Sequence, residues 1–277
     1  MRIDAHQHFW KLERGDYFWL TPELEEIYRD FLPQDLKSHL ERCGIEKTIV
    51  VQATSTVEET EFLLSLYAET DFIAGVVGWL DLESETFPQD FDRYRQRQGF
   101  VGIRPMLQDL ADDKWILRPQ VVENISRLVE NDFPIDLLIY PRHLPVIKAL
   151  LQRFPRLRAV IDHLAKPNIA KQEMHPWQEH LAEIANYPNV MCKLSGMITE
   201  ADHQKWAPDD LRPYVSHALE VFGVERVMFG SDWPVCLLAG QYEEVYQALA
   251  ANLPASLSAK EADKIFGQNA MRFYKLS

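Results

Sequence analysis

The chain has 277 residues, of which 47% are hydrophobic and 26% charged, and its formal net charge at pH 7 is −13. This length is normal for one large α/β domain, and the apolar fraction is high enough to build a core, which argues against disorder. So large a negative charge makes nucleic acid and anionic membrane surfaces poor partners. The longest apolar runs have the length of a strand and fall short of the roughly 20 residues of a membrane helix.

Cysteine usage and the first residues predict where the protein resides. Cys43, Cys192 and Cys236 are an odd number of widely spaced cysteines, so we expect reduced thiols and no disulfide framework. The opening residues MRIDAHQHFW lack the apolar region of a signal peptide, which favours a cytoplasmic protein. No repeat, linker or low-complexity segment divides the chain, so we expect residues 1–277 to form one domain.

Eight short apolar runs are typical of strands that are buried on both faces, as in a parallel sheet. These runs are Ile3–His8, Thr48–Ala53, Phe72–Leu80, Phe100–Pro105, Ile135–Tyr140, Ala159–His163, Val190–Leu194 and Val227–Gly230. Amphipathic segments between them predict helices, with Pro near several starts and Gly or Pro after several ends. We expect these helices over Asp35–Cys43, Glu58–Thr70, Pro119–Glu130, Leu144–Arg153, Pro176–Ala185, Leu211–Phe222 and Tyr242–Leu253, and a closing helix over Ser258–Tyr274.

The repeated order of strand and helix predicts the fold class. Eight such units in this length favour an α/β protein with a closed (β/α)₈ or TIM barrel. A doubly wound sheet fits the alternation too, but it usually has fewer strands and a Gly-rich first turn, which this sequence lacks. The aromatic-rich insertion at 11–33, after the first strand, is expected to cover the site.

The active sites of TIM barrels lie at the C-terminal ends of the strands. The first run ends in His6 and His8, and two residues at i and i+2 on a strand point to the same side. His163 ends the sixth run, and Asp232 follows the eighth, where an unpaired carboxylate is costly. We therefore expect His6, His8, His163 and Asp232 to form the catalytic group. A histidine bonded only to backbone, or Asp232 acting as a helix N-cap, stays open as an alternative.

Six further residues are candidates for substrate binding: Trp19, Arg104, Tyr140, Lys166, Lys193 and Trp233. The cations at strand ends, Arg104 and Lys193, can bind a carboxylate or carbonyl group of a ligand. The alternative for both is an ion pair with Asp4, Asp81 or Asp232. The aromatic side chains can form a wall on which a sugar stacks, or they can simply pack in the core.

Five phrases of the sequence are recognisable together: IDAHQHFW, GVVGWLDL, DHLAKP, CKLSGMITEA and FGSDWPVC. Over residues 3–274 the chain resembles the amidohydrolase superfamily. The closer resemblance is to its branch of lactone hydrolases, which act on sugar lactones such as L-fuconolactone and L-rhamnonolactone and include pyrone dicarboxylate lactonase. Binuclear members carry a bridging lysine or glutamate on strand four and a histidine on strand five, where this chain has Arg104 and Tyr140. The two-metal site is incomplete, so we expect that no cofactor is required. One divalent ion, such as zinc, on His6, His8 and Asp232 stays open.

The resemblance implies hydrolysis of a sugar-acid lactone (an aldonolactone). Asp232 would take a proton from water, and the three histidines would donate hydrogen bonds to the oxyanion or hold a metal. With only Arg104, Lys166 and Lys193 as cations, a neutral sugar lactone fits better than a dicarboxylate. A metal-dependent decarboxylase of the same superfamily, acting on a carboxylated aromatic, stays open, as does a non-catalytic binding barrel. The expected partner is the small-molecule lactone, and a homodimer is left open.

Overall fold

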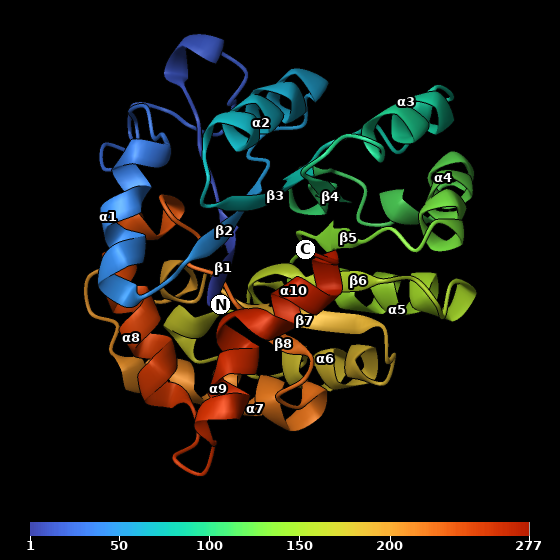
Figure 1. The fold of residues 1–277 in the computed structure, drawn as a ribbon. Coiled ribbons are helices and arrows are strands. Elements are labelled where there is room, and N and C mark those ends of the chain that lie inside the picture. The colour runs from blue at the N-terminus through green and yellow to red at the C-terminus, as the bar shows by residue number, and fades with distance from the viewer. Residues whose placement is uncertain (277) are drawn as a thin grey trace.

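The computed structural model describes residues 1–276, in which eight parallel strands pair in sequence order to form one sheet (Figure 1). The strands are β1 (Ile3–Gln7), β2 (Lys47–Val51), β3 (Ile73–Gly78), β4 (Phe100–Ile103), β5 (Ile135–Leu137), β6 (Ala159–Ile161), β7 (Val190–Leu194) and β8 (Val227–Phe229). The sheet closes where Gln7 bridges to Trp233 and where the amide of Asp232 donates to the carbonyl of His6 over 2.8 Å. The predicted TIM barrel is confirmed.

Helices surround the sheet, and most of the predicted ones are confirmed to within a few residues. They are α1 (Pro33–Cys43), α2 (Val57–Glu69), α3 (Phe87–Tyr94), α4 (Pro119–Glu130), α5 (Leu144–Arg153), α6 (Trp177–Ala185), α7 (Pro208–Phe222) and α8 (Tyr242–Asn252). Helix α3 was not predicted, although its buried Phe87, Phe91 and Tyr94 recur at helical spacing. No helix within residues 1–276 is long and apolar enough to cross a membrane.

The closing helix differs from its prediction because it is interrupted. It consists of α9 (Ala259–Asp263), a π-helical turn (Lys264–Gln268) and α10 (Asn269–Tyr274). Gly267 leaves helical geometry where it packs against the start of the chain, and an added Cβ there would contact the carbonyl oxygen of Met1. The break therefore follows from the close approach of two chain segments that are distant in sequence.

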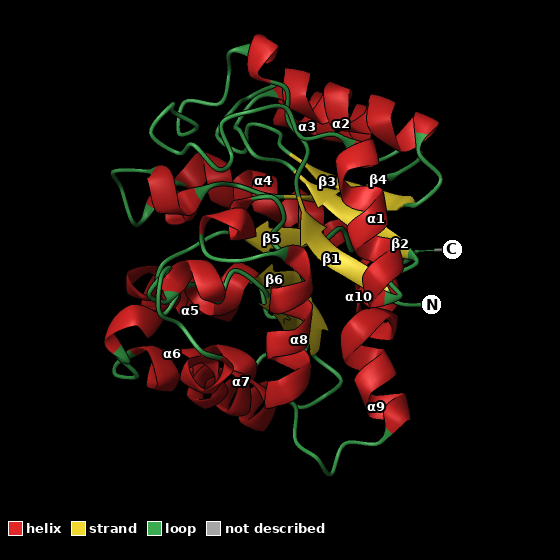
Figure 2. Cartoon of the chain, turned by 90° about the vertical axis from the view of Figure 1, so that its left-hand side faces the viewer, coloured by secondary structure: helices red, strands yellow, loops and turns green. Residues whose placement is uncertain are grey.

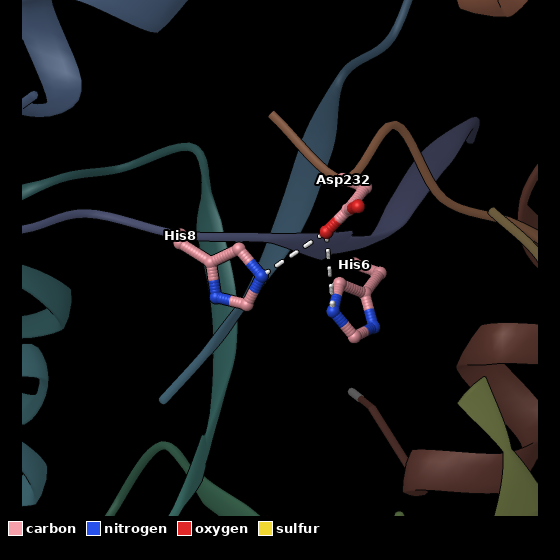
Figure 3. A group of neighbouring side chains, drawn as sticks. All are labelled: His6, His8 and Asp232. Atoms are coloured by element: carbon pink, nitrogen blue, oxygen red, sulfur yellow. Dashed lines mark hydrogen bonds and ion pairs between the residues drawn. The ribbon is translucent and has the colours of Figure 1, made fainter. Parts of the chain in front are cut away.

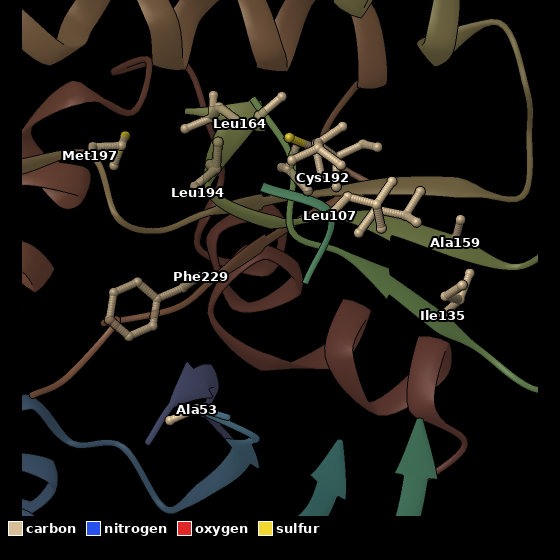
Figure 4. Packing of buried hydrophobic residues seen from close by; sticks show 14 of the residues in the cluster. Ala53, Leu107, Ile135, Ala159, Leu164, Cys192, Leu194, Met197 and Phe229 are labelled. Carbon is tan, nitrogen blue, oxygen red and sulfur yellow. The ribbon is translucent and has the colours of Figure 1, made fainter. Parts of the chain in front are cut away.

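The barrel interior is apolar at the N-terminal ends of the strands. One buried cluster there joins strand residues to α10: Ile3, Ala5, Ile49, Val51, Val77, Val160, Met191, Met228, Ala270, Phe273 and Tyr274. Helix α10 thus plugs this end of the barrel, close to the N-terminus (Figures 1 and 2). The opposite faces of the strands, with Ala159, Cys192, Leu194 and Phe229, belong to the larger core shared with the helices (Figure 4). Buried polar side chains, among them His6, His8 and Asp232, lie instead at the C-terminal mouth of the barrel.

Candidate active site

The structure brings His6, His8, His163 and Asp232 together at the C-terminal mouth of the barrel (Figure 3 shows three of the four). One carboxylate oxygen, Oδ1 of Asp232, lies 3.3 Å from Nε2 of His8 and 3.8 Å from Nε2 of both His6 and His163. All four residues are buried. Three imidazoles therefore converge on one carboxylate oxygen that is shielded from solvent.

A bulge in β1 directs His6 and His8 into the barrel. Asp4 pairs with Thr48 and Gln7 pairs with Val50. Between these two pairs β1 contains one residue more than β2. Ile3 and Ala5 already belong to the interior cluster, and regular alternation would then send both histidines outward. The extra residue reverses the alternation, which is how bulges re-aim side chains near active sites.

His163 is presented by a left-handed turn directly after β6. His163, Leu164, Ala165 and Lys166 all have positive φ, between 52° and 61°, a conformation that costs roughly 1–2 kcal/mol per residue. Two hydrogen bonds hold the turn: the amide of Lys166 donates to the carbonyl of His163 (2.7 Å), and Nε1 of Trp177 donates to that of Leu164 (2.6 Å). Such strain is typical of functional sites.

Gly196 and Ser195 fix the ring of His163 from the side of β7. Nδ1 of His163 lies 2.9 Å from the hydroxyl of Ser195. Gly196 has φ +62°, and a Cβ added there would lie 2.5 Å from the same Nδ1. A glycine is required at this position both by the backbone and by the ring that packs against it.

Asp4, which the sequence analysis did not assign to the site, ties β1 to the loop that carries Asp232. Its Oδ1 accepts from the amides of His6 (3.1 Å) and Ser231 (2.9 Å), and its Oδ2 accepts from the hydroxyl of Tyr242 (3.1 Å). Burial raises the pKa of Asp4 to about 6, although these hydrogen bonds act to lower it. The side chain thus bridges the segment that carries His6 and the loop that carries Asp232 at the closure of the barrel.

Arg104 and Lys193 both form buried ion pairs, but with aspartates other than those considered from the sequence. Nζ of Lys193 lies 2.5 Å from Asp136 and 3.0 Å from Asp162, and Nη1 of Arg104 lies 3.5 Å from Asp162. Nζ of Lys193 also lies 3.1 Å from Nδ1 of His6. Lys193 therefore sits beneath the histidines and does not line the cavity. Asp136 and Asp162 each interrupt an apolar run of the sequence. That interruption could have predicted that both aspartates have buried cationic partners.

Burial and neighbouring charges together set the titration of this centre. It raises the pKa of Asp136 to about 6, against the attraction of Lys193. Burial also favours a higher pKa for Asp162, but the charges of Lys193 and Arg104 outweigh it and leave that pKa below its usual range. The pKa values of His6, His8 and His163 are lowered, first of all by burial, so the three rings are neutral near pH 7.

The pKa of Asp232 is lowered as well. Burial would raise it, but the attraction of His163 and the hydrogen bond with His8 outweigh burial. A carboxylate that is ionised near neutral pH, next to neutral imidazoles, can accept a proton from water.

A cavity of about 150 Å³ opens above the four residues. His8, His163 and Asp232 contribute to its wall, together with Trp19, Ala53, Arg104, Met106, Gln108, Leu138, Lys166 and Val235. Trp19 comes from the 11–33 insertion, and its Nε1 donates to the carbonyl of Ala53 over 2.7 Å. Met106, Gln108 and Leu138 follow β4 and β5 and were not singled out from the sequence.

The two remaining aromatic candidates lie elsewhere. Tyr140 lines an adjacent cavity of about 310 Å³, which shares Lys166 with the first. Trp233 is 1% exposed and packs edge-on against Phe31, with ring centroids 5.2 Å apart. Trp233 is therefore placed to support the site by packing, while Lys166 and Tyr140 are placed where a substrate can reach them.

The donor set around Asp232 fits a metal ion. Nδ1 of His8 lies 2.8 Å from the carbonyl of Val51, which can only accept, so the Nε2 lone pair faces the carboxylate of Asp232. A cation or a second proton on His8 would relieve the contact between these two acceptors. Ligands about 2.0–2.2 Å from a tetrahedral ion lie roughly 3.3–3.6 Å apart, close to the separations found here. His6, His8 and Asp232 form one candidate group, and His6, Asp162 and His163 another.

Comparison with known proteins agrees with the fold and identifies the family. The amidohydrolase family profile matches residues 3–276. The chain is 45% identical to an L-fucono-1,5-lactonase of Burkholderia ambifaria over 280 residues, 99% of this chain and 96% of that protein. It is 38% identical to an L-fucono-1,5-lactonase of Burkholderia multivorans over 288 residues, 100% and 96% of the two proteins. A crystal structure of an amidohydrolase from Burkholderia multivorans with bound zinc superposes with a TM-score of 0.94 at 37% identity, covering 100% of both chains. This chain belongs to the amidohydrolase family.

Proposed function

We propose that this amidohydrolase hydrolyses the lactone of a sugar acid, with L-fucono-1,5-lactone as the first candidate substrate. The observation that carries the proposal is the convergence of three histidines on Asp232 at the base of a small cavity. The relatives with 45% and 38% identity over nearly their whole length are named for this activity. The cavity wall presents single cations, Arg104 and Lys166, which suits a neutral polyhydroxylated ring better than a dicarboxylate.

In the proposed mechanism Asp232 acts as general base. It accepts a proton from a water molecule whose oxygen attacks the lactone carbonyl carbon. The negative charge that develops on the carbonyl oxygen is stabilised by the imidazole of His163 and by Arg104 and Lys166, which line the cavity. When the ring C–O bond breaks, the proton held by Asp232 passes to the departing ring oxygen. The product is the open-chain hydroxy acid, and one water molecule is consumed.

A divalent ion would be held by His6, His8 and Asp232, and it would polarise the carbonyl as a Lewis acid. We propose that catalysis does not require it. Nη1 of Arg104 lies 3.4 Å from Nε2 of His6, so a fixed positive charge already occupies the neighbourhood in which an ion would act. Lys166 adds a second cation at the cavity wall.

The insertion at 11–33 is proposed to cover the bound substrate. Trp19 contributes one wall of the cavity from this segment, and the 150 Å³ volume leaves little room beyond one small ring. The adjacent space at Tyr140, reached past Lys166, would take the substituents of the sugar. We treat residues 1–277 as one catalytic domain. The cytoplasmic location stays a prediction, and the homodimer stays open.

A panel of lactones, followed by acid release with a pH indicator, tests the proposal. We expect turnover of six-carbon aldonolactones, with L-fucono-1,5-lactone among the best substrates, and much slower turnover of pyrone dicarboxylate. Parallel assays measure carbon dioxide release from carboxylated aromatics. Decarboxylation without lactone hydrolysis would replace the proposal with the decarboxylase alternative, and inactivity toward both classes would favour a binding barrel.

A further inference from the structure

A second cavity lies at the opposite end of the barrel from the candidate active site. It has a volume of about 360 Å³, within the range of roughly 300–1,000 Å³ that is usual for small-molecule sites. Its walls come from the segments that precede β5, β6, β7 and β8, and from α10. Helix α10 marks this end of the barrel in Figures 1 and 2.

Four arginines line this cavity: Arg156, Arg158, Arg226 and Arg272. Asp132 is the one acidic residue among the lining residues described in 1–276, and Nε of Arg158 pairs with it at 3.2 Å. Arg272 pairs with Glu225 at 3.4 Å. The lining therefore carries four arginines and one aspartate, in a protein whose net charge is −13.

The other two arginines have no ion-pair partner within residues 1–276. Arg226 is held by backbone hydrogen bonds, because its Nη1 donates to the carbonyls of Ala185 (2.8 Å), Tyr187 (3.1 Å) and Val190 (3.2 Å). Its guanidinium also lies over the ring of Phe222. Arg156 is exposed and makes no hydrogen bond among the described residues. One guanidinium is thus preorganised, and the other is free to close on a ligand.

Gathering like charges in a concave site is unfavourable unless an anion neutralises them. Guanidinium groups bind phosphate and carboxylate oxygens through paired hydrogen bonds. The apolar side chains of Met191 and Phe273 line the same cavity, and they lower the polarity in which such bonds form. We propose that this cavity binds a small multivalent oxyanion, of the phosphate or polycarboxylate kind.

A bound anion would also connect α10, the last part of the closing helix, to the barrel. Nη1 of Arg158 donates to the carbonyl of Phe273 in α10 over 2.6 Å, and Arg272 lies on the same helix. A ligand that bridges these arginines to Arg156 and Arg226 joins α10 to the loops before β6 and β8. A ligand that binds only the folded state raises Tm, by roughly 5–10 °C at a hundredfold excess over Kd for a chain of this size.

Calorimetric titration and thermal unfolding of the full chain test the site with two probes, inorganic pyrophosphate and citrate, at constant ionic strength. We expect saturable binding of at least one probe, together with a rise in Tm. Arg156→Ala removes the unpaired guanidinium and is expected to weaken binding by about ten-fold or more. Arg153→Ala is the matched control, since Arg153 is an exposed arginine in the last turn of α5 that does not line the cavity.

Tighter binding of pyrophosphate assigns the site to phosphate-containing ligands, and tighter binding of citrate assigns it to polycarboxylates. Absence of saturable binding by both probes overturns the proposal. Equal affinity in the two variants and the unaltered chain overturns it too, because the anion would then bind elsewhere. Neither measurement uses lactone turnover, so the result is independent of the proposed catalytic activity.

Discussion

Gly196→Ala is expected to displace the ring of His163 and slow catalysis while the barrel stays folded. An added Cβ would lie 2.5 Å from Nδ1 and 2.7 Å from Cγ of His163, whereas ordinary contacts begin at 3.4 Å. The ring must therefore retreat by about 1 Å. The ring of His163 also packs against the ring of His6, with centroids 4.4 Å apart, so the movement reaches the group around Asp232.

The size of the effect follows from this displacement. A misplacement of about 1 Å in a catalytic group can cost on the order of 10²-fold in rate, so kcat should fall by about that factor. Gly196 has φ +62°, and a side chain in the left-handed region costs roughly 1–2 kcal/mol. Because each kcal/mol lowers Tm by about 2–4 °C in a domain this large, a loss of roughly 2–8 °C is expected.

Gly44→Ala separates backbone strain from the clash. Gly44 ends α1 with φ +64°, and an added Cβ there meets nothing within 4 Å. Its Tm should fall by a similar amount while kcat is unchanged. The assays are calorimetric unfolding and steady-state hydrolysis of an aldonolactone. If Gly196→Ala retains the turnover of Gly44→Ala, or if both variants lose turnover equally, the placement of His163 does not limit the reaction and the reasoning fails.

Four further outcomes are expected. Asp232→Asn should lower kcat by a factor on the order of 10²–10⁴ with little change in Tm, and normal turnover in this variant would show that another group activates water. Lys166→Met should raise KM by about ten-fold with a smaller change in kcat, as expected for a charged hydrogen bond to the substrate; an unchanged KM would remove Lys166 from the binding site. Hydrolysis should survive chelation to below about a tenth of an equivalent of metal, and loss of activity that zinc restores would make the histidines ligands. Glu59 is a buried residue in the first turn of α2. Burial raises its pKa from 4.5 to about 8, so the folded state holds a proton that the unfolded chain releases. This contribution to stability is complete below pH 4.5 and is lost as the pH rises through about 8. Glu59→Gln should therefore flatten the decline of Tm over this range, and an equally steep decline would assign it to other groups.

The order of the elements and the chain positions that reach the mouth of the barrel were open to prediction. Continuous apolar runs such as Val190–Leu194 and the amphipathic segment Leu144–Arg153 match the strand and helix of the structure residue for residue. These patterns are local, because burial on both faces or on one face acts on neighbouring residues. Parallel strands of a barrel end at one common edge, so His6, His163 and Asp232 could be placed together without knowing a single distance.

Only the tertiary structure decided how those side chains are aimed and what holds them. The bulge in β1 is defined by its pairing with β2. Apolar alternation from Ile3 onward would have turned His6 outward. The pairing of Lys193 with Asp136, and the gathering of four arginines at the far end of the barrel, join segments that are distant in sequence. Periodicity reports which face of an element is buried, whereas the partner of a buried charge depends on which distant segment packs beside it, and that is settled only when the whole barrel closes.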